Sequence, residues 1–315
     1  MNNIYDIVII GGGPGGIGVS VEAKILGVEK ILLIEKSDNH SGTIRKFYKD
    51  QKRVDKDWQG QKVELEGNIE FFDGTKETTI DYFENLLDNH QIEAKFNCEV
   101  EKVVKNDEIF IINTSCGTFE AKNVIIAVGR MGKPNKPSYD IPVSVRGLTN
   151  YNLDKCSNGE DIMVVGGGDS AVEYACELSN SNGVTLNYRG DKLTRPNPTN
   201  IAMFENFLNE NKIAAKLGIN IESLENEKGK IKVNFDDGSS QIFDRIIYAI
   251  GGTTPVDFLK KCSVELDVSG EPIFDKNYET KTKGMFIAGD IAFRSGGSIA
   301  IALNHGYRIV NYINK

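Results

Sequence analysis

Glycines at a fixed spacing follow a short aliphatic run near the start of the chain. Residues 6–10 read Asp-Ile-Val-Ile-Ile, and Gly11, Gly13 and Gly16 then form the pattern G-x-G-x-x-G. This order predicts a buried strand that turns sharply into a helix, whose N-terminus favours an anion. Gly11 permits the tight turn, Gly13 lets the backbone approach a pyrophosphate, and Gly16 lets the helix pack on the strand. The stretch predicts dinucleotide binding, and the alternative is a glycine turn that serves only the fold.

An acidic residue extends this pattern by one βαβ unit. The aliphatic residues 31–34 end at Glu35, twenty-four residues after Gly11. A carboxylate at the end of the second strand accepts hydrogen bonds from ribose hydroxyls and repels a 2′-phosphate. We therefore expect the first site to bind a dinucleotide through Glu35.

A second glycine pattern lies in the middle of the chain. Gly166, Gly168 and Ala171 follow the aliphatic residues 162–165 and give the variant G-x-G-x-x-A. The next predicted strand is followed by Arg189, near the place where the first site has Glu35. A guanidinium there pairs with a 2′-phosphate and favours NADPH over NADH, unless Arg189 is only a surface residue. Arg195 is a second candidate for the same role.

The elements that must position these residues occur twice. Each copy has a βαβ unit, a small β-ribbon and a strand that closes on glycine, at residues 123–129 and 245–251. We predict an α/β protein with two Rossmann-like three-layer (ββα) nucleotide-binding domains, the second inserted into the first. Residues 1–132 and 252–315 are predicted to form the first domain, and residues 133–251 the second. A helix is expected at residues 78–90, with Thr79 as its N-cap, and a hairpin turn at residues 115–117.

Composition limits the classes of function. The 315 residues carry a net charge of −8 and a pI of about 5.2, which argues against a nucleic-acid-binding surface. No apolar run is long enough to span a bilayer and no secretion signal opens the chain, so we expect a soluble cytoplasmic protein. The five cysteines form no C-x-x-C pair and no zinc-like spacing, so most are expected to be ordinary buried thiols and no metal is expected.

Four motifs, in order, resemble the low-molecular-weight thioredoxin reductase family of flavoproteins: residues 11–16, 127–129, 166–171 and 286–290. The resemblance covers essentially the whole chain. It implies FAD at the first site, NADPH at the second, a homodimer, and a rotation of one domain that alternates redox partners at the flavin. The implied FAD residues are Gly11, Gly13, Pro14, Gly15, Gly16, Glu35, Lys36, Gly129, Gly289, Asp290, Ser298 and Ile299. The implied NADPH residues are Gly166, Gly168, Asp169, Ser170, Ala171 and Arg189.

The chain departs from that family at the redox-active dithiol. The C-x-x-C of thioredoxin reductases corresponds to residues 149–152, which read Thr-Asn-Tyr-Asn, and the nearby Cys156 is alone. A single thiol cannot form the internal disulfide that passes electrons to thioredoxin. Related bacillithiol disulfide reductases carry a cysteine in the first glycine loop, where this chain has Gly15. We therefore predict that electrons leave the flavin directly.

Four short segments narrow the resemblance to one branch of this family. Residues 46–48, 52–57, 186–189 and 302–306 are similar to a bacterial branch without C-x-x-C, the flavodoxin:quinone reductases, and ferredoxin/flavodoxin-NADP reductases are a close second. The resemblance implies that NADPH, quinone and flavodoxin are the redox partners.

The first domain also holds a run with a local reversal of charge. Residues 45–58 carry six basic residues against three acids, with Phe47, Tyr48 and Trp58 among them. This segment either steers an acidic flavodoxin or is a solvated loop. No catalytic residue is certain. His305, near the predicted flavin site, is a weak candidate, and His40 is a candidate to line the cofactor channel.

Two rival functions remain open. One is disulfide reduction through Cys156 or a substrate thiol. The other is a non-catalytic sensor that binds FAD and NADPH.

Overall fold

The chain folds into two compact units. The structure, a computed structural model, describes residues 4–57, 61–130, 134–153, 155–252, 254–293 and 297–315. The first unit consists of residues 1–133 and 253–315, and the second, residues 134–252, is inserted into it. Both boundaries of the inserted unit lie one residue later than those predicted from the sequence, residues 133 and 251. Pro134 and Gly252 form an isolated β-bridge, and the N–H of Asn135 donates to the carbonyl of Gly251 at 2.8 Å, so Gly252 stays with the second unit.

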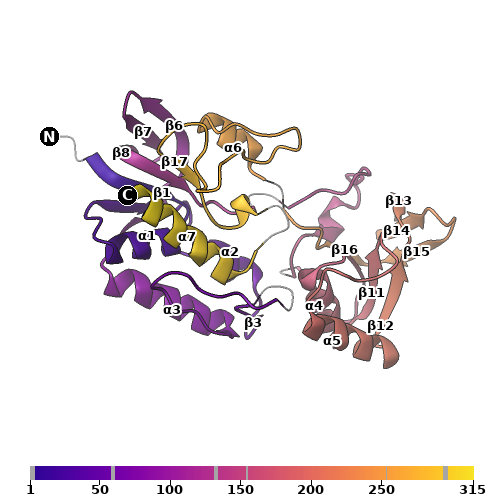
Figure 1. Cartoon of the computed structure of the whole chain (residues 1–315). Coiled ribbons are helices and arrows are strands. Elements are labelled where there is room, and N and C mark those ends of the chain that lie inside the picture. The colour runs from indigo at the N-terminus through magenta and orange to yellow at the C-terminus, as the bar shows by residue number, and fades with distance from the viewer. Residues whose placement is uncertain (1–3, 58–60, 131–133, 154, 253, 294–296) are drawn as a thin grey trace. The chain divides into compact units, whose positions relative to one another are not determined.

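A seven-stranded sheet forms the centre of the first unit (Figure 1). Four strands run parallel to their neighbours in the order β5 (Glu93–Lys95), β2 (Ile31–Ile34), β1 (Ile4–Ile10) and β8 (Gly117–Ile126), and β17 (Met285–Ile287) adds to β8. The N-terminal half of β8 pairs antiparallel with β7 (Ile109–Thr114), which pairs with β6 (Val100–Asn106). The long strand β8 thus belongs both to the parallel sheet and to a β-meander.

Helices cover one face of this sheet. They are α1 (Pro14–Ile25), α3 (Lys76–Asn89) and α7 (Ile299–Ile313), and Ile7 and Ile9 of β1 point into their core (Figure 1). Val8 and Ile10 point to the other face, where the meander and α6 (Val256–Lys261) form the second core. Helices, sheet and meander make the three predicted layers. The short elements α2 (Gly42–Phe47), β3 (Arg53–Val54) and β4 (Gly74–Thr75) lie between β2 and α3 in the chain.

The predicted N-cap of α3 is wrong by one turn. Thr75, not Thr79, caps the helix: its hydroxyl accepts from the N–H of Thr78, and the Thr78 hydroxyl accepts from the N–H of Thr75 at 2.8 Å. Thr79 is buried within the first turn. Three threonines, Thr75, Thr78 and Thr79, lie at this helix start, and the reciprocal pair of hydrogen bonds decides between them.

The second unit repeats the plan. A parallel sheet has the order β12 (Ile213–Leu217), β11 (Gly183–Tyr188), β10 (Asp161–Val165), β16 (Arg245–Tyr248) and β9 (Thr149–Asn150). The helices α4 (Asp169–Leu178) and α5 (Pro198–Asn209) pack on one face. The antiparallel strands β13 (Ile221–Glu227), β14 (Lys230–Phe235) and β15 (Ser240–Phe243) contribute to the core on the other. A short 3₁₀ helix, η1 (Arg146–Leu148), precedes β9. The predicted α/β fold with two Rossmann-like units is confirmed.

Candidate functional site

Two glycines of the first fingerprint, the G-x-G-x-x-G motif at residues 11–16, are required by the fold of the chain, whether or not a ligand is bound. Gly11 has φ +111°, and a Cβ there would lie 2.5 Å from the carbonyl oxygen of Ala127. A Cβ at Gly16 would collide with the carbonyl oxygen of Gly11. These glycines allow β1 to turn directly into α1 and keep the helix close to the sheet.

Gly13 is different, because nothing in the described chain requires a glycine there. It is the N-cap of α1, with the ordinary extended values φ −83° and ψ −178°, and a Cβ would meet no atom within 4 Å. Its position offers no side-chain cap, and Pro14 opens the helix. The backbone at Gly13 therefore borders open space at the N-terminus of α1, which leaves room for a phosphate group.

Glu35 is held at the carboxyl end of β2. One carboxylate oxygen accepts from the N–H of Gly12 at 2.6 Å, and the other accepts from the N–H of Ser37 at 2.8 Å. A carboxylate has about four acceptor sites in all, so lone pairs remain for ribose hydroxyls. Glu35 is half-buried and the neighbouring Lys36 is exposed. This arrangement fits the predicted ribose-binding role of Glu35.

The turn after β17 lies against the glycine loop. The 3₁₀ helix η2 (Gly289–Ala292) begins at Gly289, with φ +74°, and a Cβ at Gly15 would lie 2.9 Å from the Cα of Gly289. Gly129 has φ +65° at the end of the β8 segment, where glycine is favoured. Ser298 is the N-cap of α7 and accepts from the N–H of Ile301 at 3.2 Å, and Ile299 is the first helical residue. The structure thus brings the predicted FAD residues to one edge of the first unit.

Asp290 lies in a crowded turn, but its side chain still reaches solvent. Its side chain is exposed, while desolvation by nearby atoms raises the pKa of its carboxyl above the ordinary value, and the N–H of Gly297 and the charge of Arg130 oppose that rise. The Nε of Arg130 also donates to the backbone oxygen of Asp290 at 2.9 Å, and its guanidinium pairs with Glu271. Arg130 was not predicted as a site residue, although it directly follows Gly129.

Asp290→Ala is expected to retain FAD about tenfold less tightly than the parent protein, because one charge-assisted hydrogen bond to the ligand is lost. The measurement is flavin retained after dialysis, with Asp81→Ala, at an exposed position of α3, as a control in the same unit. A fully flavinated, normally active Asp290→Ala protein would remove Asp290 from the site.

His305 contacts the turn that begins at Gly289. It lies in α7 and is buried, its Nδ1 accepts from the N–H of Gly289 at 3.2 Å, and its ring packs against Tyr278 at 4.5 Å between centroids. Because Nδ1 accepts, the neutral ring carries its proton on Nε2. Burial and the charge of Arg308 lower the pKa of His305 to about 4, while Glu66 opposes the change. The geometry makes His305 a positioning residue for the Gly289–Asp290 turn.

This burial predicts a loss of stability on acidification. The unfolded histidine takes up a proton below a pKa of about 6.5, whereas the folded one does so only below about 4. As pH falls from 6.5 towards 4, protonation therefore favours the unfolded state and lowers the free energy of unfolding by up to about 3 kcal/mol. His305→Asn keeps an acceptor for Gly289 but cannot titrate. Thermal unfolding between pH 4 and 7.5 should show a smaller acid loss for the variant, and parallel losses in both proteins would contradict the role.

His40 does not line an open channel. It is buried, and its Nε2 lies 3.0 Å from the Arg45 guanidinium, which can only donate, so Nδ1 donates to Ser41 at 3.0 Å. Burial lowers the pKa of His40 to about 4. The hypothesis that His40 contacts a cofactor is not supported, because its ring nitrogens serve the turn before α2.

The second fingerprint repeats the geometry of the first. Gly166 has φ +152°, and a Cβ there would collide with the carbonyl oxygen of Ala249. Gly168, the N-cap of α4, has φ −112° and ψ −178°, and a Cβ would meet nothing within 4 Å. Ala171 is buried in the first turn of α4. This loop therefore also leaves room for a phosphate group at a helix N-terminus.

The remaining predicted NADPH residues fall into two groups. Ser170 and Arg189 are exposed, and among the described residues Arg189 makes no hydrogen bond or ion pair, so its guanidinium is available to a ligand. Arg195 is also exposed. Asp169 instead binds the start of α5: one carboxylate oxygen accepts from the N–H of Asn197 at 2.8 Å and from the amide of Asn200 at 2.7 Å. Asp169 thus supports the loop before α5.

The cysteines differ in part from the prediction. Cys176 and Cys262 are buried thiols and Cys156 is half-buried, but Cys98 and Cys116 form a disulfide. The expectation of ordinary thiols is therefore wrong for these two. Cys116 lies in the turn predicted at residues 115–117, and the spacing of the cysteines does not pair it with Cys98. Burial raises the pKa of Cys262 to about 12, which suppresses its thiolate.

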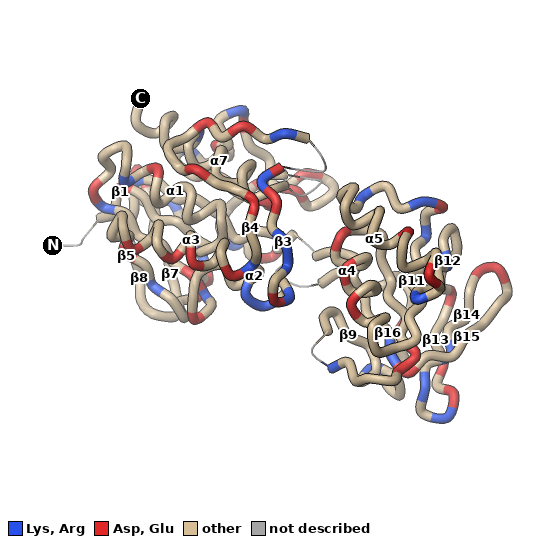
Figure 2. Tube along the Cα trace, turned by 90° about the horizontal axis from the view of Figure 1, so that it is seen from below, with Lys and Arg blue, Asp and Glu red and all other residues tan. Residues whose placement is uncertain are grey.

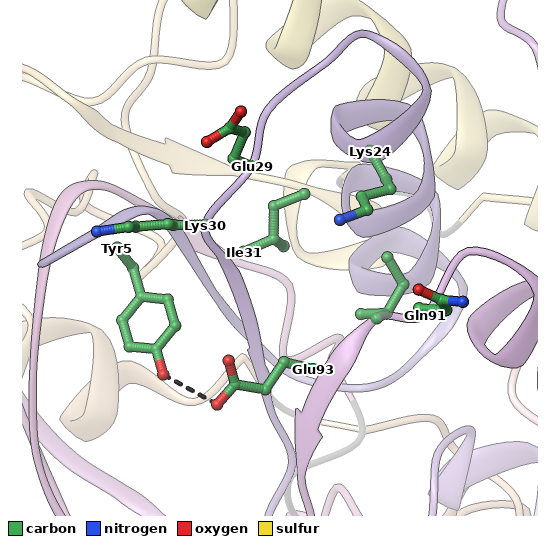
Figure 3. A pocket seen from close by; sticks show the side chains of 8 residues that line it. Tyr5, Lys24, Glu29, Lys30, Ile31, Gln91 and Glu93 are labelled. Carbon is green, nitrogen blue, oxygen red and sulfur yellow. Dashed lines mark hydrogen bonds between the residues drawn. The ribbon is translucent and has the colours of Figure 1, made fainter. Parts of the chain in front are cut away.

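A recess in the first unit lies at the other end of the sheet. It has a volume of about 210 Å³ and is lined by residues such as Tyr5, Lys24 and Glu93, and the Tyr5 hydroxyl donates to Glu93 at 2.9 Å (Figure 3). Tyr5, Ile31 and Glu93 lie at the amino ends of β1, β2 and β5. Nucleotides bind beyond the carboxyl ends of parallel strands, so this recess is not part of the candidate site.

Two kinds of site are absent from the described part of the chain. It contains no group of histidine, cysteine and acidic side chains that could hold a metal ion. None of its helices is long and apolar enough to cross a membrane.

Comparison with known proteins identifies the family. Residues 8–289 match the model of the pyridine nucleotide-disulphide oxidoreductase family. The chain belongs to this family. Its members are FAD- and NAD(P)H-dependent oxidoreductases, so the predicted cofactors, FAD and NADPH, are confirmed at that level.

The relatives carry two kinds of name. The chain is 29% identical to the bacilliredoxin reductase Bdr of Bacillus subtilis, covering 98% of this chain and 97% of that protein. It is 27% identical to a ferredoxin--NADP reductase of Streptococcus sanguinis, covering 97% and 92%. A solved bacillithiol disulfide reductase from Staphylococcus aureus has a TM-score of 0.85 at 23% identity, covering 99% and 98%. Solved thioredoxin reductases share this fold, which confirms the predicted architecture.

Proposed function

We propose that the protein transfers electrons between NADPH and an electron carrier, flavodoxin or a quinone, through FAD in the first unit. FAD supplies the chemistry that accepts a hydride and releases electrons singly. The ferredoxin--NADP reductase relatives support this assignment. A homodimer and a cytoplasmic location belong to the same proposal.

The chain's own residues bind and orient the cofactors in this account. The loops at Gly13 and Gly168 receive the phosphates, Glu35 receives the ribose of FAD, and Arg189 receives the 2′-phosphate of NADPH. Asp290 binds a hydroxyl of FAD, and His305 and Arg130 hold its turn in place. Hydride transfer requires alignment more than a protein acid or base, so a short set of catalytic residues is expected.

The close approach of Gly15 to Gly289 is the observation that favours this function over disulfide reduction. A Cβ at Gly15 would lie 2.9 Å from the Cα and 3.0 Å from the N of Gly289, so a cysteine in the glycine loop would displace the turn that carries Asp290. Residues 149–152 carry no cysteine either. The loop thiol of bacillithiol disulfide reductases and the dithiol of thioredoxin reductases therefore have no counterpart here.

Disulfide reduction remains the rival function, because the bacilliredoxin reductase of B. subtilis covers the chain at 29% identity. In the rival proposal such an activity uses Cys156, a half-buried free thiol, or a thiol of the substrate. Cys156→Ser separates the two functions. The variant should reduce flavodoxin and quinone at the parental rate, whereas NADPH-dependent turnover of a disulfide that is lost in Cys156→Ser would establish the rival. A non-catalytic sensor would show negligible turnover with every acceptor.

The basic segment around α2 is less positive than its sequence indicates. Figure 2 shows Lys and Arg gathered over α2 and the chain leading to β3. Arg45 is engaged with His40 and lies 3.9 Å from Glu84, and Arg53 pairs with Asp55 and Asp73. Trp58 lies outside the described residues. Lysines such as the exposed Lys46 are the charges that remain for an acidic carrier.

A charge reversal tests this surface. Lys46→Glu should lower kcat/KM for flavodoxin about threefold at low salt and leave quinone reduction unchanged, because electrostatic steering acts on the rate of association. The effect should vanish at high ionic strength. Lys228→Glu, on the β13–β14 turn, is the matched control. Equal losses for both acceptors, or a loss that salt does not remove, would mean that Lys46 does not steer the carrier.

A further inference from the structure

The disulfide joins the two ends of the β6–β7 hairpin and is open to solvent on one side. Cys98 precedes β6 and is fully buried, whereas Cys116 follows β7 and is exposed. Cys116 is therefore the half of the disulfide that lies on the solvent side. Thiol–disulfide exchange depends on this access.

The hairpin does not need the disulfide to stay closed. The N–H of Ser115 donates to the carbonyl of Glu99, and the N–H of Glu99 donates to the Ser115 hydroxyl, both at 2.9 Å. Val100 and Thr114 then begin the antiparallel ladder. These hydrogen bonds hold the same two ends together, so the covalent bond can open while the hairpin remains.

The disulfide also ties down the segment that supports Glu35. The N–H of Cys98 donates to the carbonyl of Glu35 at 3.0 Å, and the N–H of Asn97 donates to the carbonyl of Ser37 at 2.8 Å. Glu35 in turn accepts from the N–H of Gly12 in the glycine loop. A chain of direct contacts thus runs from the sulfur atoms to the first fingerprint.

We propose that Cys98–Cys116 is a reversible thiol-redox site, opened by a dithiol that attacks Cys116, and that its reduction loosens the backbone around Glu35. In reducing compartments, disulfides are generally redox-sensing or catalytic rather than permanent. The expected consequence, weaker binding of FAD, rests on the proposed function. The site is separate from the flavin-to-carrier reaction and regulates cofactor retention.

The reaction balances with a dithiol as the reductant. One thiolate of the reductant attacks the Cys116 sulfur, the bond to Cys98 breaks, and Cys98 leaves as a thiolate that takes a proton. The second thiol of the reductant, as its thiolate, attacks the mixed disulfide and releases Cys116, which is then protonated. The protein disulfide gains two electrons and two protons, and the reductant is oxidised to its disulfide.

The reduced form is also accommodated. The Thr114 hydroxyl oxygen lies 3.3 Å from the Cys98 sulfur and 3.4 Å from the Cys116 sulfur. It donates its proton to the carbonyl of Gly117 at 2.7 Å and accepts from the N–H of Cys116 at 3.2 Å. A hydroxyl has two acceptor positions, so one remains for a thiol of the reduced pair.

The test compares the protein before and after dithiothreitol under native conditions. Alkylation and peptide mass spectrometry should show Cys116 labelled under native conditions only after reduction, and the buried Cys98 labelled when the reduced protein is then denatured. Amide hydrogen exchange of the apoprotein should become faster at residues 35–38 and 95–99. The Kd for FAD should rise about fivefold or more, as for a typical coupling between two sites. Cys116→Ser should resemble the reduced protein with or without dithiothreitol, and Cys156→Ser should respond like the parent.

Three outcomes separate the claims. If Cys116 is not labelled until the protein is denatured, the redox site is wrong. If Cys116 is labelled but exchange at residues 35–38 does not change, the coupling to Glu35 is wrong. If labelling and exchange change as expected while the Kd for FAD does not, the redox site stands and the FAD position in the proposed function fails.

Discussion

Gly13→Ala is expected to fold as the parent protein does and to bind FAD about a hundredfold more weakly. Its φ of −83° and ψ of −178° suit any residue, and a Cβ meets no protein atom within 4 Å. The added methyl group therefore occupies only the space next to the N-terminus of α1, where the pyrophosphate is proposed to lie. Losing one or two hydrogen bonds to a charged group, at about 1.5 to 3 kcal/mol each, gives a change of this size.

Titration of the apoprotein with FAD, followed by flavin fluorescence, measures this loss, and thermal unfolding of the apoprotein checks the fold. Two matched glycines calibrate the result. Gly147→Ala, at another open and exposed position, should change neither quantity. Gly16→Ala should lower the stability of the apoprotein, because its methyl group collides with the carbonyl of Gly11. Parental FAD affinity in Gly13→Ala would show that the loop does not hold the pyrophosphate.

Arg189→Ala is expected to raise the KM for NADPH about ten- to a hundredfold and to leave the KM for NADH nearly unchanged. The exposed guanidinium is proposed to pair with the 2′-phosphate, and a hydrogen bond to a charged group contributes about 1.5 to 3 kcal/mol. Steady-state reduction of quinone with each nucleotide measures the effect, with Lys228→Ala as a control in the same unit. Equal changes for both nucleotides would remove Arg189 from the 2′-phosphate.

The two glycine motifs could be predicted because their spacing and the order strand, glycines, helix can be read from the sequence. Gly11 and Gly166 each follow a strand and precede a helix, and that order can be read within a few residues, although the carbonyls that crowd them belong to the distant Ala127 and Ala249. The inserted arrangement followed from finding the same order of elements twice. Glu35 and Arg189 were predicted from their place at the end of the second strand in each copy.

Residues that depend on distant contacts could not be predicted in the same way. The Cys98–Cys116 pair requires the register of β6 against β7, in which Val100 faces Thr114. Asp169 lies inside a nucleotide motif, yet it binds the start of α5, twenty-eight residues later in the chain. His305 bonds to Gly289 only because α7 returns to the edge of the first sheet. Such contacts arise from packing rather than from spacing in the sequence.

The central claim is that electrons pass from NADPH to the flavin and then directly to a carrier. The most direct measurement is anaerobic: the flavin absorbance is followed on adding NADPH or NADH, and then on adding flavodoxin, a quinone or a small disulfide. The account predicts rapid bleaching by NADPH, slower bleaching by NADH, and recovery with flavodoxin or quinone. Recovery only with the disulfide would contradict the direct transfer of electrons, and no bleaching by either nucleotide would contradict the assignment of the second unit.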